Sequence, residues 1–310
     1  GWMSDLLTLL TSATLPIFAV SAVGFWLARR GMFTQAQAEG VNAFAMKVAV
    51  PALIFGLLSR ADLGGYDWRV MGLYALAEVT VYGATYLVCR HGFGLMRREA
   101  LLLGMASIFV NGVFFVLPIA GLLYGPSAEE VIVGLVVIDS TLLFGGTILI
   151  MDILAKREGG LVKLATTFAT NPVIVAMVLG VGVSLAGVAL PPGLETYVSF
   201  VGAAASPAAL FALGVILSDV RWAEVGGSVP AVIAMKMIAQ PLVTFGLMVW
   251  LAAPSLWSET AVLFTAGPAG AMPFVIALSY GIRTDRIAIV VIVTTLLSLV
   301  TLPGAALLGG

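Results

Sequence analysis

Cysteine, histidine and charged side chains are all scarce in this chain of 310 residues, and each scarcity excludes a class of function. The single cysteine, Cys89, rules out a disulfide framework and a cysteine-based zinc site. The single histidine, His91, lies beside Arg90 at the end of an apolar stretch, where a solvated interfacial role is expected. No catalytic constellation is evident, so the sequence predicts neither an enzyme nor a protein that carries a cofactor or metal.

Charged residues make up only 10% of the chain and the net charge is −1, so there is no basic surface for nucleic acid. Hydrophobic residues reach 61% and the mean hydropathy is +1.10. A soluble domain has roughly 45–50% apolar and about 25% charged residues. Water cannot solvate that much apolar surface, so the chain is expected to lie in lipid. We interpret Gly1-Trp2 before Met3 as an expression-vector remnant, and no cleavable signal peptide is evident.

Ten apolar stretches approach the length of about 20 residues that a helix needs to cross a bilayer. The sequence therefore predicts an all-α membrane protein with ten transmembrane helices joined by short connectors. The predicted spans are 6–28, 41–59, 69–89, 100–124, 129–151, 168–189, 196–217, 229–252, 259–280 and 287–307.

Lysine and arginine are concentrated in alternate loops, which would all lie on one side of the membrane, and basic loops stay on the cytoplasmic side. Only Arg60 and Arg69 fall on one side of the predicted bundle. The bias predicts a multi-pass protein of the cytoplasmic membrane with both termini outside. The basic residues at the predicted inner ends are Arg29, Arg30, Arg90, Arg97, Arg98, Lys156, Arg157, Lys163, Arg221, Arg283 and Arg286.

The sequence repeats itself at an offset of 156 residues. The matching positions include Pro16 with Pro172, Gly24 with Gly180, Gly31 with Gly187, "PALIF" (51–55) with "PAALF" (207–211), and Tyr124 with Tyr280. We therefore predict two five-helix repeats, 3–155 and 165–310. Because five is odd, two like halves must enter the membrane from opposite sides, which gives an inverted repeat typical of secondary transporters.

Two corresponding spans, the fourth and the ninth, carry helix-breaking residues near their middle. The fourth contains Asn111, Gly112 and Pro118, and the ninth contains Gly270 and Pro273. Interrupted helices in matching positions indicate a transporter binding site, and half-helix N-termini suit an anionic ligand. These five residues are the predicted substrate contacts, with a pair of simple proline kinks as the alternative.

Four ionisable residues fall inside predicted spans: Lys47, Glu78, Asp139 and Lys236. Charges at membrane depth are costly and usually functional, so these four are candidates for ion coupling or for a charge pair. Both lysines are near cytoplasmic ends and could instead reach the interface. The two acids could instead form structural contacts, although the positions one repeat later are uncharged.

Several motifs together resemble the auxin efflux carrier family, including its bacterial members and the wider bile-acid/auxin transporter superfamily. They are "NAFAMKVAVPALIF" (42–55), "NGVFFVLPIAGLLYG" (111–125), "NPVIVAMVLGVGVSLAGVALPPGL" (171–194), "ASPAALFALGVILS" (205–218) and "GPAGAMPFVIALSYG" (267–281).

This resemblance implies a scaffold domain from spans 1, 2, 6 and 7 and a transport domain from spans 3–5 and 8–10. It also implies broken crossover helices in spans 4 and 9, an elevator-like movement and organic-anion substrates. Plant members export auxin, and bacterial members are often linked to malate or malonate. The chain departs from the plant carriers in its short connector at 152–167 and in Glu78, which is displaced by about one helical turn.

These observations favour a secondary active transporter of a small organic anion, such as a dicarboxylate or an auxin-like acid, with a proton as one candidate for the coupled ion. A sodium-coupled symporter of the bile-acid type is the alternative. Such a protein needs a cluster of Glu, Gln, Asn and Ser/Thr ligands at the crossovers, and here the main candidates are Asn111 and Ser107. A membrane-embedded sensor or scaffold is a third reading, disfavoured by the short loops. The expected partners are the anion and membrane lipid, with a homodimer as an allowed assembly.

Overall fold

The computed structural model is helical throughout the part of the chain that it describes. Within that part, the single pairing of extended backbone is an antiparallel bridge between Val110 and Ala269. The prediction of an all-α protein is confirmed. The described residues are 2–155, 169–219, 225–252 and 254–308.

The first half of the chain contains eight α-helices, several of which continue into π-helical turns, labelled η. They are α1 (Trp2–Arg29), α2 (Gln35–Phe44), η1 (Ala45–Ala49), α3 (Val50–Ser59), α4 (Trp68–Leu87), η2 (Val88–Gly92), α5 (Arg97–Ala106), η3 (Gly112–Val116), α6 (Leu117–Tyr124), α7 (Pro126–Ile138), η4 (Asp139–Gly145) and α8 (Gly146–Leu154).

The second half follows the same order of long and broken helices. The described elements are α10 (Pro172–Ala186), α11 (Pro192–Gly202), α12 (Ala205–Leu217), α13 (Ser228–Ala234), η6 (Met235–Ala239), α14 (Gln240–Leu251), α15 (Leu256–Thr265), α16 (Met272–Ser279) and α17 (Asp285–Leu308).

Six helical segments of the described chain are long and apolar enough to cross a membrane. Two shorter apolar helices, Phe18–Arg29 and Pro172–Ala186, accompany them. The lengths and composition support a multi-pass membrane protein. The six segments are Gln35–Ser59, Trp68–Gly92, Pro126–Leu154, Pro192–Leu217, Ser228–Leu251 and Asp285–Leu302.

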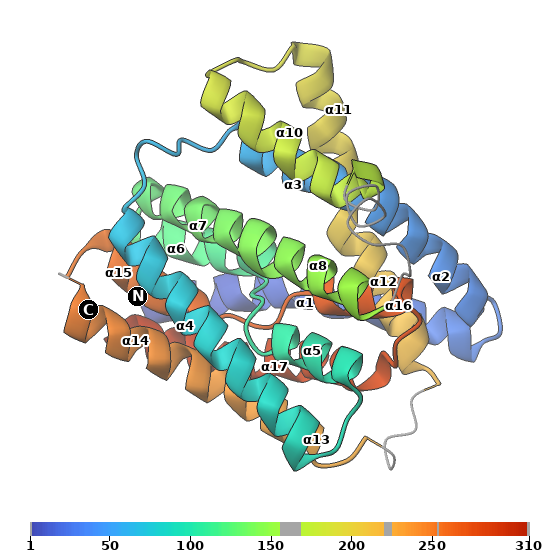
Figure 1. Cartoon of the computed structure of the whole chain (residues 1–310). Coiled ribbons are helices and arrows are strands. Elements are labelled where there is room, and N and C mark those ends of the chain that lie inside the picture. The colour runs from blue at the N-terminus through green and yellow to red at the C-terminus, as the bar shows by residue number, and fades with distance from the viewer. Residues whose placement is uncertain (1, 156–168, 220–224, 253, 309–310) are drawn as a thin grey trace.

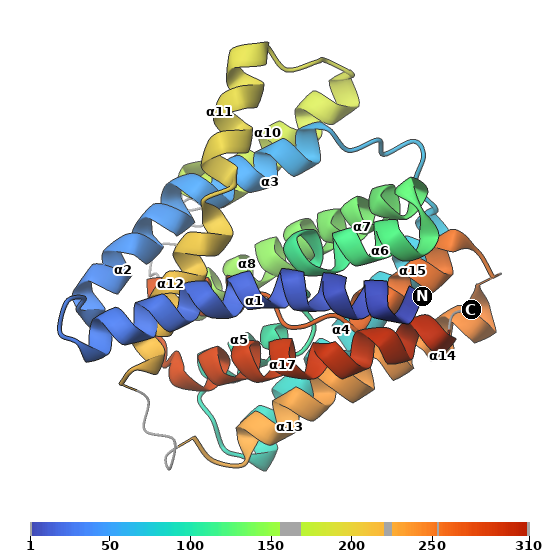
Figure 2. The same cartoon turned by 180° about the vertical axis from the view of Figure 1, so that it is seen from behind.

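The helices form two groups (Figures 1 and 2). In one group α10 and α11 pack against α3, and α12 packs against α1 and α2. In the other group α4 packs against α5 and α14, and α15 packs against α7 and α14. Helix α17 lies beside α1, α12 and α13, so it links the two groups.

Two glycines one repeat apart make corresponding helix contacts. A Cβ on Gly24 of α1 would lie 2.4 Å from the carbonyl oxygen of Phe211 in α12. A Cβ on Gly180 of α10 would lie 3.2 Å from the carbonyl oxygen of Phe55 in α3. Phe55 and Phe211 are themselves repeat partners in the sequence alignment. Small residues allow such close backbone approach between membrane helices.

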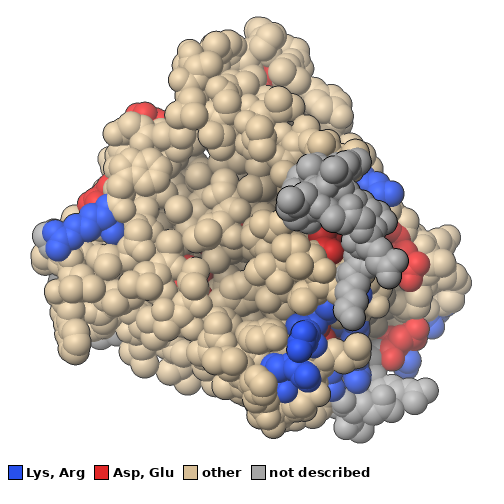
Figure 3. Space-filling view, viewed as in Figure 1, with Lys and Arg blue, Asp and Glu red and all other residues tan. Residues whose placement is uncertain are grey.

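Large apolar side chains cover much of the outer surface, as lipid contact requires. Phe200 is 81% exposed and Trp250 is 87% exposed. Figure 3 shows a broad uncharged band across one face, with most of the charged residues gathered toward its opposite ends. This surface fits a protein whose middle lies in hydrocarbon.

Some of the sequence predictions fall on residues outside the described ranges. These are the inner-side residues Lys156, Arg157, Lys163 and Arg221, together with 165–168 at the start of the predicted second repeat and the terminal residues 1, 309 and 310.

Candidate functional site

The two interrupted segments cross one another as extended backbone. Helix α5 ends at Ala106 and α15 ends at Thr265, and neither resumes at once as α-helix. The Asn111 N–H donates to the Pro268 carbonyl at 2.9 Å, and the Gly270 N–H donates to the Phe109 carbonyl at 2.8 Å. The unwound backbone therefore satisfies part of its own hydrogen bonding, as membrane depth demands.

Pro118 and Pro273 lie just after these breaks rather than within them. Pro273 occupies the first turn of α16, where a missing N–H costs nothing, because the first backbone N–H groups of a helix have no partner within it. Pro118 lies where the π-helical turn η3 passes into α6, inside a helical run that begins at Gly112. The breaks themselves lie around 107–111 and 266–271.

Gly112 and Gly270 permit the close approach of the two segments. A Cβ on Gly112 would lie 2.3 Å from Cε2 of Phe264, and one on Gly270 would lie 2.9 Å from Cδ1 of Phe109. No real Cβ sits that close to another carbon, so a larger residue would push the segments apart. The structure places both predicted glycines at the crossing.

A small cavity of about 70 Å³ adjoins the crossing. Its volume corresponds to roughly two water molecules, at about 30 Å³ each. The Asn111 side chain is half-buried and makes no hydrogen bond within the described part of the chain. The polar side chains that line the cavity are Asn111, Asp139, Ser140 and Ser206.

A larger vestibule of about 700 Å³ lies next to this cavity, and both are lined by Leu53, Leu57 and Val113. The vestibule separates α3 and α11 on one side from α7 and α15 on the other. A route for a small molecule toward the crossing can therefore run between the two helix groups.

Charged groups also line the vestibule. Arg60 donates from Nε to the Gly56 carbonyl at 2.9 Å, and from Nη2 to Ser199 Oγ at 3.3 Å. Burial, together with the carboxylates of Asp62 and Glu130, raises the pKa of the Tyr66 hydroxyl. The lining of the vestibule thus combines one guanidinium with two carboxylates.

Lys236 is fully buried and holds the end of the broken helix α15. Its Nζ donates to the Thr265 carbonyl at 3.0 Å and to the Gly267 carbonyl at 2.6 Å. These carbonyls lie at and just beyond the C-terminus of α15, where a cation is favoured by the helix dipole. Lys236 therefore stabilises the unwound ninth segment and does not extend to the interface.

Gln240, one turn further along the same helix, holds the other broken helix. Its Nε2 donates to the two carboxylate oxygens of Glu78 at 2.9 and 3.0 Å and to the Ile108 carbonyl at 2.8 Å. Ile108 follows the end of α5. One continuous stretch, α13–η6–α14, thus contacts both unwound segments. Sequence reasoning missed Gln240, although an amide in an apolar span was a detectable signal.

Asp139 lies on the cavity side of this polar cluster. Tyr74 donates its hydroxyl to Asp139 Oδ1 at 2.6 Å, whereas Oδ2 is buried and has no hydrogen-bond partner among the described residues. Asp139 is 1% exposed. Unlike Glu78, it contributes to the lining of the cavity.

The structure brings three of the four predicted charges together. Glu78 and Asp139 both interact electrostatically with Lys236, although no ion pair within 4.0 Å joins them in the described chain. Lys47 is exposed on η1, apart from the cluster. Lys47, Asp139 and Lys236 all lie in π-helical turns, which occur frequently at functional sites.

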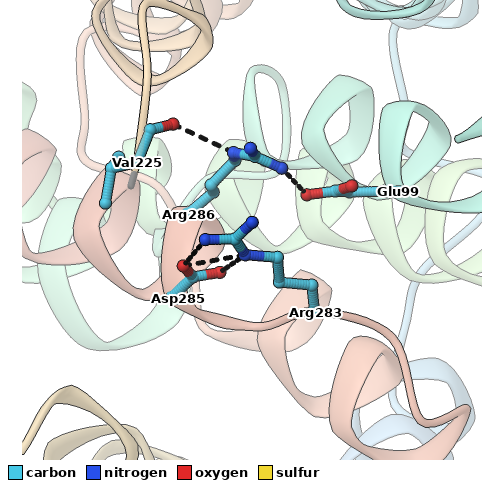
Figure 4. Close-up of polar contacts among 5 residues, drawn as sticks. All are labelled: Glu99, Val225, Arg283, Asp285 and Arg286. Carbon is cyan, nitrogen blue, oxygen red and sulfur yellow. Dashed lines mark hydrogen bonds and ion pairs between the residues drawn. The ribbon is translucent and has the colours of Figure 1, made fainter. Parts of the chain in front are cut away.

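A second polar group lies at the predicted inner end, away from the crossing (Figure 4). Arg286 at the start of α17 pairs with Glu99 of α5 and donates from Nε to the Val225 carbonyl at 3.0 Å. Arg283 pairs with Asp285 at 2.7 Å. The Arg286–Glu99 pair ties together the ends of α5 and α17.

Asn42 connects α2 to α16 at the same end. Its Nδ2 donates to the Val275 carbonyl of α16 at 3.2 Å and to Ser279 Oγ at 3.1 Å. Asn42 belongs to α2 and is 2% exposed. Helices α2 and α16 are therefore in polar contact here, whereas the vestibule separates α3 and α11 from α7 and α15.

Comparison with known proteins gives a consistent set of matches. The model of a family described as "Membrane transport protein" matches residues 9–164 and 161–305. A protein of Rhizobium meliloti named "Putative malonate transporter" is 26% identical over 304 residues, covering 95% of this chain and 94% of its own. An "Uncharacterized transporter" of Methanothermobacter thermautotrophicus is 26% identical, covering 94% of this chain and 96% of its own. A rice protein named "Probable auxin efflux carrier component 3b" is 24% identical, covering 56% of this chain and 30% of its own.

Proposed function

Since the chain belongs to the membrane transport protein family, that of the auxin efflux carriers, we propose that it is a secondary active transporter of a small organic anion. A dicarboxylate such as malonate is the first candidate, because a relative covered over nearly its whole length carries that name. The proposed location is the cytoplasmic membrane, with both termini outside.

The proposed architecture is ten spans arranged as two inverted five-helix repeats, 3–155 and 165–310. The reciprocal glycine contacts support it, since α1 packs on α12 as α10 packs on α3. Helices α10 and α12 are the repeat counterparts of α1 and α3. A helix of one half therefore packs on the other half as its counterpart does, which is expected when a pseudo-two-fold axis relates the halves. The scaffold domain then comprises α1–α3 and α10–α12, and the remaining helices form the transport domain.

The crossing of the two unwound segments is the observation that carries the proposed function. The N-terminal ends of the helices that begin at 112 and 272 face this region, and free N–H groups there favour an anion. Asn111 presents an unpaired amide to the cavity. In this proposal Asn111 contacts the substrate, while Gly112, Pro118, Gly270 and Pro273 shape the site.

An elevator-type movement of the transport domain against the scaffold is consistent with the different contacts on the two sides of the boundary between these proposed domains. The vestibule opens on the side of Arg60, whereas Asn42 ties α2 to α16 on the other. With the proposed orientation this arrangement is an outward-facing state. Transport would then require the Asn42 contacts to break, and the vestibule to close.

Uptake of radiolabelled carboxylates by proteoliposomes tests the proposal. We expect malonate or another small carboxylate to accumulate in vesicles that contain wild-type protein. An Asn111→Ala variant should fold normally but bind that anion at least roughly tenfold more weakly, which corresponds to about 1.4 kcal/mol. Uptake equal to that of empty vesicles for every carboxylate would refute the proposed function.

A further inference from the structure

The buried cluster next to the crossing contains one more acid than base. Glu78, Asp139 and Lys236 are exposed by 1% or less. If all three were ionised, the cluster would carry a net negative charge. An uncompensated charge in such a place is strongly destabilising. One neutralising cation is therefore required, and a proton on one of the acids is the simplest.

The hydrogen bonds distinguish the two acids. Both oxygens of Glu78 accept from Gln240, and Glu78 does not line the cavity. Asp139 accepts from the Tyr74 hydroxyl at Oδ1 and is also faced by the Val110 backbone N–H, whereas its Oδ2 is buried and makes no hydrogen bond of ordinary length among the described residues. A buried carboxylate oxygen that accepts no hydrogen bond is unfavourable. When Oδ2 is protonated it becomes a hydroxyl, which can donate a hydrogen bond to an acceptor bound beside it.

The cavity supplies the place where that acceptor would bind. Asp139 lines it together with Asn111, Ser140 and Ser206. A carboxylate bound there would accept hydrogen bonds from the Asn111 amide and from the Asp139 hydroxyl. Two donors of this kind allow an anion to bind beside an acidic residue without repulsion.

Resting on the proposed function, we propose that Asp139 is the coupling residue, which carries the transported proton on Oδ2 and donates it as a hydrogen bond to the substrate anion. Glu78 remains an ionised partner of Gln240 and Lys236. The proton enters from water through the vestibule, moves with the anion and leaves to water on the other side. The titratable groups that face Asp139 from neighbouring elements are Tyr74 and Glu78 of α4 and Lys236 of η6.

Calorimetric titration of purified protein with malonate, in two buffers of different ionisation enthalpy, counts the protons taken up on binding. Because the free cluster needs this proton to be neutral, we expect little uptake near neutral pH, rising toward about one proton per malonate at alkaline pH, where the free protein has lost the proton, for the wild type and for Glu78→Gln. For Asp139→Asn we expect malonate to bind without proton uptake, because the amide donates without needing a proton. The same variant should lose the stimulation of uptake by an inward proton gradient, while Glu78→Gln should keep it over a lower pH range, because Lys236 alone then balances Asp139.

Tyr74→Phe serves as a second variant in case Asp139→Asn does not fold. Loss of the Tyr74 hydroxyl removes a donor that favours the ionised carboxylate, so the pH range over which binding takes up a proton should move upward. Proton uptake by Asp139→Asn equal to that of the wild type at alkaline pH would overturn the assignment and leave the proposed function intact. Loss of proton uptake in Glu78→Gln, or sodium-dependent binding without proton uptake, would do the same. A wild type that binds neither malonate nor any other carboxylate would overturn both proposals.

Discussion

Replacing Lys236 with methionine removes the buried cation that bonds to the unwound ninth segment. The change keeps the length of the side chain but deletes two charge-assisted hydrogen bonds, to the carbonyls of Thr265 and Gly267. It also leaves Glu78 and Asp139 without their shared counter-charge. Breaking a buried charge interaction by removing one partner costs about 3–5 kcal/mol.

That loss corresponds to a fall in Tm on the order of 10 °C, at about 2–4 °C per kcal/mol for a chain of this general size. Thermal unfolding of purified Lys236→Met in detergent, followed by tryptophan fluorescence, measures it. Lys47→Met is the matched control, because Lys47 also lies in a π-helical turn but is exposed. We expect this control to change stability by less than about 0.5 kcal/mol.

A double variant tests the electrostatic part of the argument. In Lys236→Met/Glu78→Gln one of the two acids is neutral, so part of the lost stability should return. Lowering the pH should likewise reduce the deficit of the single variant, because a protonated carboxyl needs no counter-charge. The reasoning is wrong if Lys236→Met melts with the wild type, or if the double variant is no more stable than the single one.

Other predictions follow from the helix contacts and from the proposed orientation. Gly24→Leu should destabilise the protein by about 1–3 kcal/mol, since its side chain would meet the Phe211 carbonyl; Gly182→Leu, at a position with open space, is the control, and equal melting temperatures would contradict the packing argument. Ser127→Cys should react with an impermeant maleimide from outside intact cells, whereas Met96→Cys, at a residue 75% exposed, should not; the opposite pattern would reverse the orientation. Arg286→Gln should lower stability by about 1–3 kcal/mol, because it leaves the buried carboxylate of Glu99 without its ion-pair partner. A Glu99→Gln/Arg286→Gln variant no more stable than Arg286→Gln would argue against that pairing.

The helical class and the transporter family were predictable because they depend on properties spread over the whole chain. An apolar content of 61% with few charges requires lipid, and lipid requires helices whose backbone is satisfied within each segment. The motifs at 42–55 and 267–281 were enough to indicate the family that the comparison then matched. The ten spans and the inverted repeat remain predictions.

The site was only partly predictable, since local sequence patterns do not show which distant segments lie next to each other. The Gly and Pro residues of 111–125 and 267–281 marked where the helices would break, but not that the breaks would bond to each other. Both prolines follow the breaks: Pro273 lies in the first turn of α16, and Pro118 lies where η3 passes into α6. Gln240 was overlooked because its importance comes from Glu78 and Ile108, which lie far away in the sequence.

The sequence by itself determined that this chain is a helical membrane protein, which residues are costly in lipid and where the backbone must break, because each is a local balance of side-chain chemistry against hydrocarbon. Only the tertiary structure decided which charges share one cluster. It separated exposed Lys47 from buried Lys236, bound Glu78 to Gln240 and left one oxygen of Asp139 unpaired beside the cavity. Those differences depend on which helix faces pack together, and long-range packing, not local composition, sets the partner of every buried polar group.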